Sequence, residues 1–167
     1  MADSLDKDAK FYTNSGIDKT NSGDFAGALE DFNKSLEIKP DWALTYFSKA
    51  IVFHNLQRLE DAFENYSKAI ELKPDMVDAY YNRAHVILLD KNNHTDEKEL
   101  KKALCDLQKA VELDNKFTDA YYYLGVVKMK LKDYKGAVNE LDKVLALEPD
   151  AIHSKALKKL LLQKYIK

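Results

Sequence analysis

Four histidines and one cysteine are the side chains of this chain best suited to metal binding or nucleophilic catalysis. No two histidines have the spacing that would place them on one helix face as metal ligands, and only stacking of separate helices could bring His54 and His85 together. Cys105 lies among Leu104 and Leu107, and a single cysteine forms no internal disulfide, so we interpret it as structural. The histidines are His54, His85, His94 and His153.

The sequence also lacks the motifs by which many enzymes hold a phosphate, a metal or a nucleophile. It contains no glycine-rich phosphate loop, no paired-cysteine motif, no zinc-protease helix motif and no nucleophile elbow. The five glycines stand at predicted turns or close-packing positions. We therefore predict a protein that is not an enzyme and that has no metal and no cofactor.

Composition gives little indication of a partner. The 167 residues carry a net charge of −2 and 32% charged side chains, which favours neither nucleic acid nor an anionic membrane. No segment approaches the roughly 18 to 20 apolar residues of a membrane span, and the first residues contain no apolar stretch typical of a signal peptide. We expect a cytoplasmic protein with no membrane contact.

A repeat period organises the chain. Each of the three prolines precedes an aspartate and closes a helix-like run, and the first two prolines, Pro40 and Pro74, are 34 residues apart. Pro149 follows 75 residues later, which is two periods plus seven, with Asn115 in place of the missing proline. Because proline ends a helix and aspartate accepts from free N–H groups at a helix start, each pair predicts a tight corner between helices. A fixed period of this kind indicates a repeat array.

Within each period a large residue is followed one helical turn later by a small one. Two helices approach closely only where one has a small side chain and the other fills the gap, so the pattern predicts a helical hairpin in every period. On the first helix the pairs are Tyr12 and Gly16, Tyr46 and Ala50, Tyr80 and Ala84, and Tyr121 and Gly125; on the second they are Ala28 and Phe32, Ala62 and Tyr66, Ala103 and Leu107, and Ala137 and Leu141.

These positions, with the closing prolines and the period of 34, resemble the tetratricopeptide repeat family over residues 9–164. The resemblance implies an all-α fold, a right-handed α-solenoid of four antiparallel helical hairpins with a C-terminal capping helix, in a single domain spanning 1–167. Two departures are Lys19 and Lys128, where the family usually has a large apolar residue, and we expect looser packing there. The expected repeats are about 9–42, 43–76, 77–117 and 118–151, followed by the capping helix 151–167.

Two segments leave alternatives open. Seven extra residues in the third repeat, within 90–98, form either a solvated tip or a contact loop beside a groove; Asp96 and Glu99 resemble a capping box. The last segment carries lysines and no acids beyond Asp150, which suits either a capping helix or a contact with nucleic acid or phospholipid. We favour the solvated tip and the capping helix, and nucleic acid is not the expected partner.

Helical phase predicts which residues of the first helices face a concave surface. Aromatic and apolar side chains recur on this face, which indicates a groove for a peptide or helix; the alternative is that the rings only fill the interior of the array or pack on the terminal helix. The predicted groove residues are Thr13, Asn14 and Ile17, then Phe47, Ser48, Ile51 and His54, then Tyr81, Asn82 and His85, and finally Tyr122, Tyr123, Val126 and Met129.

One subclass of the family binds the acidic tails of chaperones through a carboxylate clamp of lysines, asparagines and an arginine. Asn82 matches that clamp. Phe47 and Ile51 stand where the preceding repeat should have lysine and asparagine, and Asp119 and Tyr123 stand where the following repeat should have lysine and arginine. We therefore predict that chaperone C-terminal tails are not partners.

The sequence thus predicts a protein-interaction scaffold or adaptor that binds a peptide or helix of a partner protein in its concave groove. A second hypothesis is a structural element that forms a homo-oligomer through its apolar face or its last helix.

Overall fold

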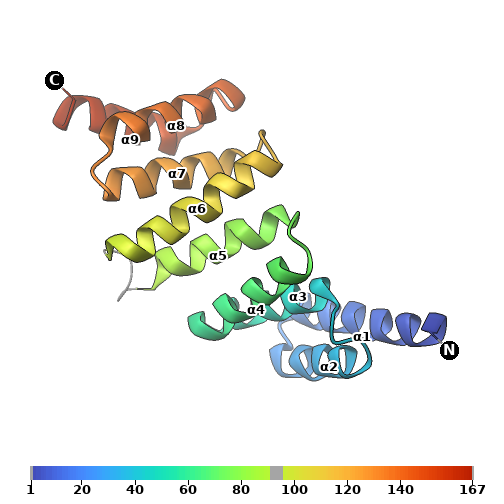
Figure 1. The fold of residues 1–167 in the computed structure, drawn as a ribbon. Helices are drawn as coiled ribbons and strands as arrows, with labels where there is room; N and C mark the ends of the chain where they lie inside the picture. Colours follow the sequence, from blue (N-terminus) through green and yellow to red (C-terminus); the bar gives the residue numbers. More distant parts are fainter. Residues whose placement is uncertain (1, 91–95, 167) are drawn as a thin grey trace. The chain divides into compact units, whose positions relative to one another are not determined.

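The computed structural model describes residues 2–90 and 96–166, and side chains from residue 5 onward. Within those ranges the chain forms nine helices and no strand (Figure 1). Three helices begin where repeats were predicted to begin, at Ala43, Val77 and Thr118. The helices are α1 (Ala2–Ser22), α2 (Phe25–Ile38), α3 (Ala43–Asn55), α4 (Leu59–Leu72), α5 (Val77–Leu89), α6 (Glu97–Leu113), α7 (Thr118–Lys130), α8 (Tyr134–Leu147) and α9 (Ile152–Lys164).

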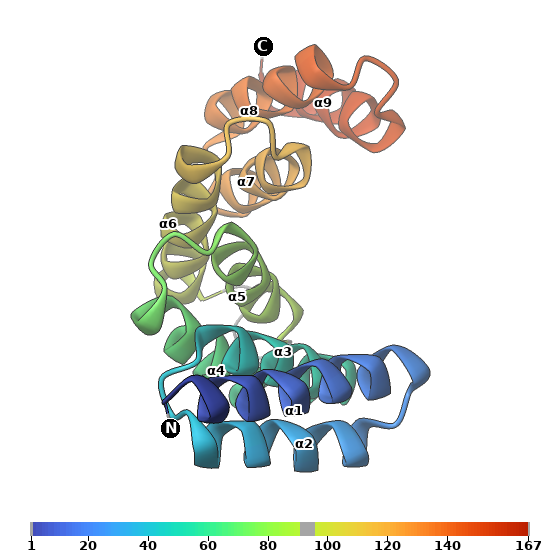
Figure 2. The same ribbon diagram turned by 90° about the vertical axis from the view of Figure 1, so that its right-hand side faces the viewer.

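The chain divides into two compact units, residues 1–79 and 80–167, and the boundary falls inside α5. In the first unit α1 pairs with α2 and α3 with α4, and α3 also contacts α1 and α2 (Figure 2). In the second unit α7 packs against α6 and α8, and α8 packs against α9. The single domain, the four hairpins and the right-handed sense remain predictions.

The predicted small-to-large packing is present in both units. A methyl group added at Gly16 would lie 2.5 Å from a ring carbon of Phe32, and one added at Gly125 would lie 3.2 Å from Leu141 Cγ. The paired residues of the second helices are fully or almost fully buried. They are Ala28, Phe32, Ala62, Tyr66, Ala103, Leu107, Ala137 and Leu141.

The predicted helix cap at Asp96 is present, whereas those at Asp41 and Asp150 are not. The Asp96 side chain accepts from the backbone N–H groups of Lys98 and Glu99, as expected. Asp41 and Asp150 do not cap the helices that follow, because α3 and α9 begin one residue later, after the N-cap residues Trp42 and Ala151. The rest of the predicted tip in 90–98, residues 91–95, lies outside the described residues, and so does His94.

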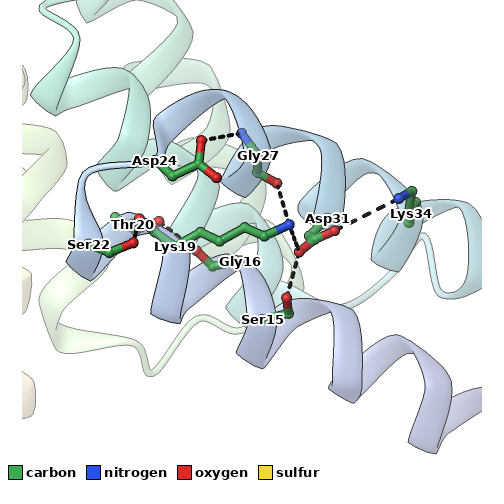
Figure 3. Close-up of polar contacts among 9 residues, drawn as sticks. All are labelled: Ser15, Gly16, Lys19, Thr20, Ser22, Asp24, Gly27, Asp31 and Lys34. Carbon is green, nitrogen blue, oxygen red and sulfur yellow. Dashed lines mark hydrogen bonds and ion pairs between the residues drawn. The ribbon is translucent and has the colours of Figure 1, made fainter.

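Lys19, where we expected looser packing, forms an ion pair with the second helix of its hairpin. Its Nζ lies 2.6 Å from Asp31 Oδ2 on α2, and Ser15 Oγ donates to the same oxygen at 2.6 Å (Figure 3). Burial alone raises the pKa of the Asp31 carboxyl, but the hydrogen bonds from Lys19 and Ser15 outweigh it, and the net pKa is lowered. The cation therefore replaces an apolar contact with a paired, hydrogen-bonded charge between α1 and α2.

Candidate functional site

The second unit carries a cluster of aromatic rings on α5, on α7 and at the N-cap residue of α7. The ring centroids of Tyr81 and Phe117 are 4.9 Å apart, those of Tyr81 and Tyr123 are 5.8 Å apart, and the Tyr122 ring meets Tyr123 edge-on at 5.5 Å. His85 stacks on Tyr81 and lies with Nε2 3.2 Å from the Tyr123 hydroxyl. We call these five residues, Tyr81, His85, Phe117, Tyr122 and Tyr123, the aromatic cluster.

Helical spacing explains why the rings meet. Tyr81 and His85 stand four residues apart on α5, so both lie on one face of that helix, and Tyr123 on α7 contacts both of them. Rings that meet edge-on or stack with an offset are favoured over perfectly face-to-face pairs. The cluster is therefore ordered by contacts among its own members before any partner binds.

A pocket of about 430 Å³ opens beside the aromatic cluster. Tyr81, Tyr122 and Tyr123 line one side, and the start of α9 lines another. Thr118 Oγ1 donates to Glu148 Oε1 at 2.5 Å across the pocket, which joins the start of α7 to the end of α8. The remaining lining residues are Thr118, Asp119, Val144, Glu148, Ala151, Ile152, His153 and Ser154. We call this cavity the α7–α9 pocket.

The electrostatics of the α7–α9 pocket are acidic. Burial, with the neighbouring Tyr123 and Asp119, raises the pKa of Tyr81 to about 12. Burial, with Tyr122 and Asp119, also raises the pKa of Tyr123. Burial lowers the pKa of His85, so its imidazole is neutral at neutral pH. The phenols and the imidazole are thus uncharged, and the carboxylates supply the charge.

The first unit has a smaller and apolar pocket of about 210 Å³ between α1 and α3. Four of the predicted residues line it, namely Ile17, Phe47, Ser48 and Ile51. Phe47 is half-buried, and its ring centroid lies 5.7 Å from that of Tyr66, so part of the ring packs into the core. The residues not predicted for this pocket are Thr20, Asn21 and Leu44. We call it the α1–α3 pocket.

The prediction that Thr13 lines the groove is wrong. Thr13 is fully buried, and its Oγ1 donates to the Ala9 carbonyl at 3.1 Å and lies within 2.8 Å of the hydroxyls of Ser35 and Thr45. The hydroxyl group satisfies buried polar atoms between α1, α2 and α3 rather than facing solvent. A short polar side chain was read as a surface residue because sequence alone does not show its partners.

The remaining predicted groove residues occupy different environments. Asn14 is exposed on α1, whereas His54, Asn82 and Val126 are half-buried and line neither pocket. Met129, and in part Tyr122, packs against the core of α8 and α9, as the packing alternative expected. The structure thus brings together two separate subsets, one in each unit.

Two pocket-lining residues that were not among the predicted groove residues could have been found from the sequence. Leu44 is the second residue of α3 and lines the α1–α3 pocket, and Asp119 is the second residue of α7 and lines the α7–α9 pocket. Each lies about one helical turn before a predicted groove residue, Phe47 or Tyr122, and so shares its face. Glu148, Ile152 and His153 have no such signal.

None of the described side chains forms a group suited to a metal ion. No set of three or more histidines, cysteines, aspartates or glutamates in 5–90 and 96–166 is placed to hold one. Within the same part of the chain, no helix combines the length and the apolar character of a membrane span.

The arrangement of antiparallel helices with small-to-large contacts defines an all-α helical-repeat protein. A family model described as TPR repeat matches residues 52–89, and one described as tetratricopeptide repeat matches residues 94–161. The chain belongs to the tetratricopeptide repeat family, and its fold class is an all-α solenoid.

Solved structures show the same fold. A crystal structure of MamA superposes with a TM-score of 0.84 at 24% identity, over 94% of this chain and 82% of that one. TTC0263, a thermophilic TPR protein of Thermus thermophilus, superposes with a TM-score of 0.67 at 19% identity, over 93% of this chain and 81% of that one. The first TPR of Spaghetti (RPAP3), bound to the HSP90 peptide SRMEEVD, superposes with a TM-score of 0.64 at 23% identity, over 72% of this chain and 90% of that one.

One curated relative matches part of the chain. An uncharacterized protein of Methanocaldococcus jannaschii is 39% identical over 56 residues, which is 34% of this chain. The match covers 65% of the relative's own length, just under two thirds.

Proposed function

We propose that this chain is a non-catalytic scaffold that holds a segment of a partner protein against the first helices of its repeats. Proteins of this family are in general protein-interaction scaffolds, and the proposal adds the place of binding. The observation that carries it is the α7–α9 pocket beside the aromatic cluster. Aromatic side chains give a large contact area at small cost in conformational entropy, and clustered rings are typical of binding hot spots.

The α1–α3 pocket offers a second contact for the same or another segment. Its lining contains Ile17, Phe47 and Ile51, and the described side chains that line it include no charged residue. An aliphatic or aromatic side chain of a partner suits this pocket. The clamp for acidic tails is replaced in this chain by Phe47, Asp119 and Tyr123, so we keep the prediction that chaperone C-terminal tails do not bind.

Affinity capture from extracts of the native cells tests the proposal. We expect a protein that is retained by the wild-type chain and lost with Tyr122→Ala, because Tyr122 lines the pocket and is only half-buried. The matched control is Tyr12→Ala on α1, a half-buried tyrosine that lines neither pocket. Equal capture by both variants, at unchanged helicity and melting temperature, would contradict the proposed site.

Self-association is a second candidate function, which the exposed apolar side chains of α9 favour. Ile152 is 76% exposed, Leu160 49% and Leu162 43%. Exposed apolar side chains are typical of contacts between copies. If self-association is the function, light scattering will show a mass that rises with concentration and falls to the monomer in Leu160→Glu/Leu162→Glu; a monomeric wild-type chain at every concentration would contradict it.

A further inference from the structure

The α7–α9 pocket and the α1–α3 pocket differ in one respect that indicates what each can bind. The second residue of the lining first helix is Leu44 in the α1–α3 pocket and Asp119 in the α7–α9 pocket. The α7–α9 pocket also has Glu148, whereas the α1–α3 pocket has no carboxylate among its described lining residues. The two pockets therefore present different charges beside similar aromatic surfaces.

The carboxylates of the α7–α9 pocket have no cation within its lining. The described side chains around it include no lysine and no arginine, and its histidine, His153, is exposed at the start of α9. The Thr118 hydroxyl donates a hydrogen bond to Glu148. Because the hydroxyl is uncharged, this contact fixes the position of the carboxylate without neutralising its charge. Asp119 is exposed in the first turn of α7. Two negative charges thus lie at the rim of an aromatic pocket.

Lysine and arginine side chains complement such a pocket in two ways. Their cationic heads pair with carboxylates, and the same heads, or the alkyl stems, lie favourably on the faces of tyrosine rings. A carboxylate-rich ligand would instead meet two like charges, and like-charge contacts across an interface disfavour binding.

We propose that the α7–α9 pocket binds a lysine or arginine side chain of a partner peptide, with neighbouring apolar residues of that peptide on Tyr122 and Ile152. The inference rests on the proposed function, because it names the chemistry of the segment that the scaffold holds. A carboxylate clamp for acidic tails binds negatively charged ligands, whereas the α7–α9 pocket is proposed to bind positively charged ones. The α1–α3 pocket, which lacks the two carboxylates, does not share this preference.

A random 12-residue peptide library displayed on phage, selected against the full chain, provides the probe. We expect the enriched peptides to contain lysine or arginine in excess over the unselected library, next to aliphatic or aromatic residues. A fluorescent synthetic peptide with the consensus sequence then measures affinity by polarisation. Replacing its lysine by glutamine, or its arginine by citrulline, should weaken binding about tenfold, as should Asp119→Asn/Glu148→Gln in the protein, and added salt should weaken binding.

The matched control is Glu112→Gln, which removes one exposed carboxylate of α6 in the same unit and outside the pocket lining. It should leave the affinity unchanged. Melting temperatures of all variants show whether they are folded.

The outcomes separate the preference from the proposed function. Enrichment of neutral or acidic peptides whose binding Tyr122→Ala abolishes would overturn the preference for cations and leave the peptide-binding function standing. Cationic peptides that bind equally to wild type and to Asp119→Asn/Glu148→Gln would overturn the assignment of the pocket. No enrichment over an empty support would overturn both proposals.

Discussion

Lys128 Nζ lies 2.6 Å from Glu140 Oε1, between α7 and α8, and repeats in the second unit the relationship of Lys19 to Asp31 in the first. Lys143 contacts the other carboxylate oxygen of Glu140 at 2.9 Å. A third acid on a second helix, Asp106 on α6, receives two hydrogen bonds from Arg83 of α5, at 2.7 and 2.8 Å. Buried acids on the second helices are thus paired with cations from the first.

Removing the charge of Glu140 should destabilise the protein. Glu140 is only 6% exposed and the Lys128 side chain 19%, so Glu140→Gln leaves a poorly solvated cation without its partner. We expect the free energy of unfolding to fall by about 2 kcal/mol in urea titrations. The control is Glu112→Gln, an exposed acid, for which we expect a change within about 0.5 kcal/mol. Equal effects of the two substitutions would contradict the role of the buried pair.

The ion pairs of Glu140 with Lys128 and Lys143 also predict that stability depends on pH. Burial alone would raise the pKa of Glu140, but the hydrogen bonds from Lys128 and Lys143 outweigh it and the folded pKa is lowered. The contribution is therefore fully present above the unfolded pKa of about 4.3 and is lost as the pH falls through the lower folded value. Between neutral pH and about pH 3 the wild type should lose more stability than Glu140→Gln, measured by urea unfolding; parallel losses would count against this assignment.

Tyr66→Phe should stabilise the chain. Tyr66 is fully buried, and no hydrogen-bond partner for its hydroxyl lies among the described residues. Removing an unsatisfied buried hydroxyl should raise the free energy of unfolding by about 1 kcal/mol. The reciprocal control, Phe32→Tyr at the matching position of α2, should lower it. A loss of stability in Tyr66→Phe would show that the hydroxyl has a partner after all.

Gly16 and Gly125 occupy matching positions but should respond differently to alanine. The added methyl at Gly16 would lie 2.5 Å from the buried Phe32 ring, so Gly16→Ala should lower the free energy of unfolding by about 2 kcal/mol. At Gly125 the methyl lies 3.2 Å from the branched Leu141 side chain, and the gain of about 1 kcal/mol in helix propensity offsets the crowding. Thermal unfolding of both variants measures the difference, and a smaller loss at Gly16 than at Gly125 would contradict the packing argument.

Lys132→Gly should stabilise the turn between α7 and α8. Lys132 has φ +65°, in the left-handed region that is unfavourable for residues with a Cβ, whereas the matching turn of the first hairpin has Gly23 at φ +83°. We expect a gain of about 1 kcal/mol in thermal unfolding. Gln108→Gly, in the middle of α6, should instead lower stability, because glycine is a poor helix former. Losses of similar size in both variants would argue against strain at Lys132.

Much of the fold could be predicted because its determinants are local. The period of 34 and the proline positions predict the starts of α3 and α5, and the corner at Asn115 predicts that of α7. The alternation of small and large residues predicts the contacts of Gly16 with Phe32 and of Gly125 with Leu141. These features depend on helix geometry and side-chain size, which each segment carries in its own residues.

The sequence by itself determined the helices, their spacing and the family, whereas the tertiary structure decided which polar and charged groups share a site. Thr118 and Glu148 are 30 residues apart and meet because α7 and α8 pack together. Thr13 is buried beside Ser35 and Thr45, whose hydroxyls lie within 2.8 Å of its own. Such pairings depend on the side chains of neighbouring helices, and no periodicity within a single helix encodes them.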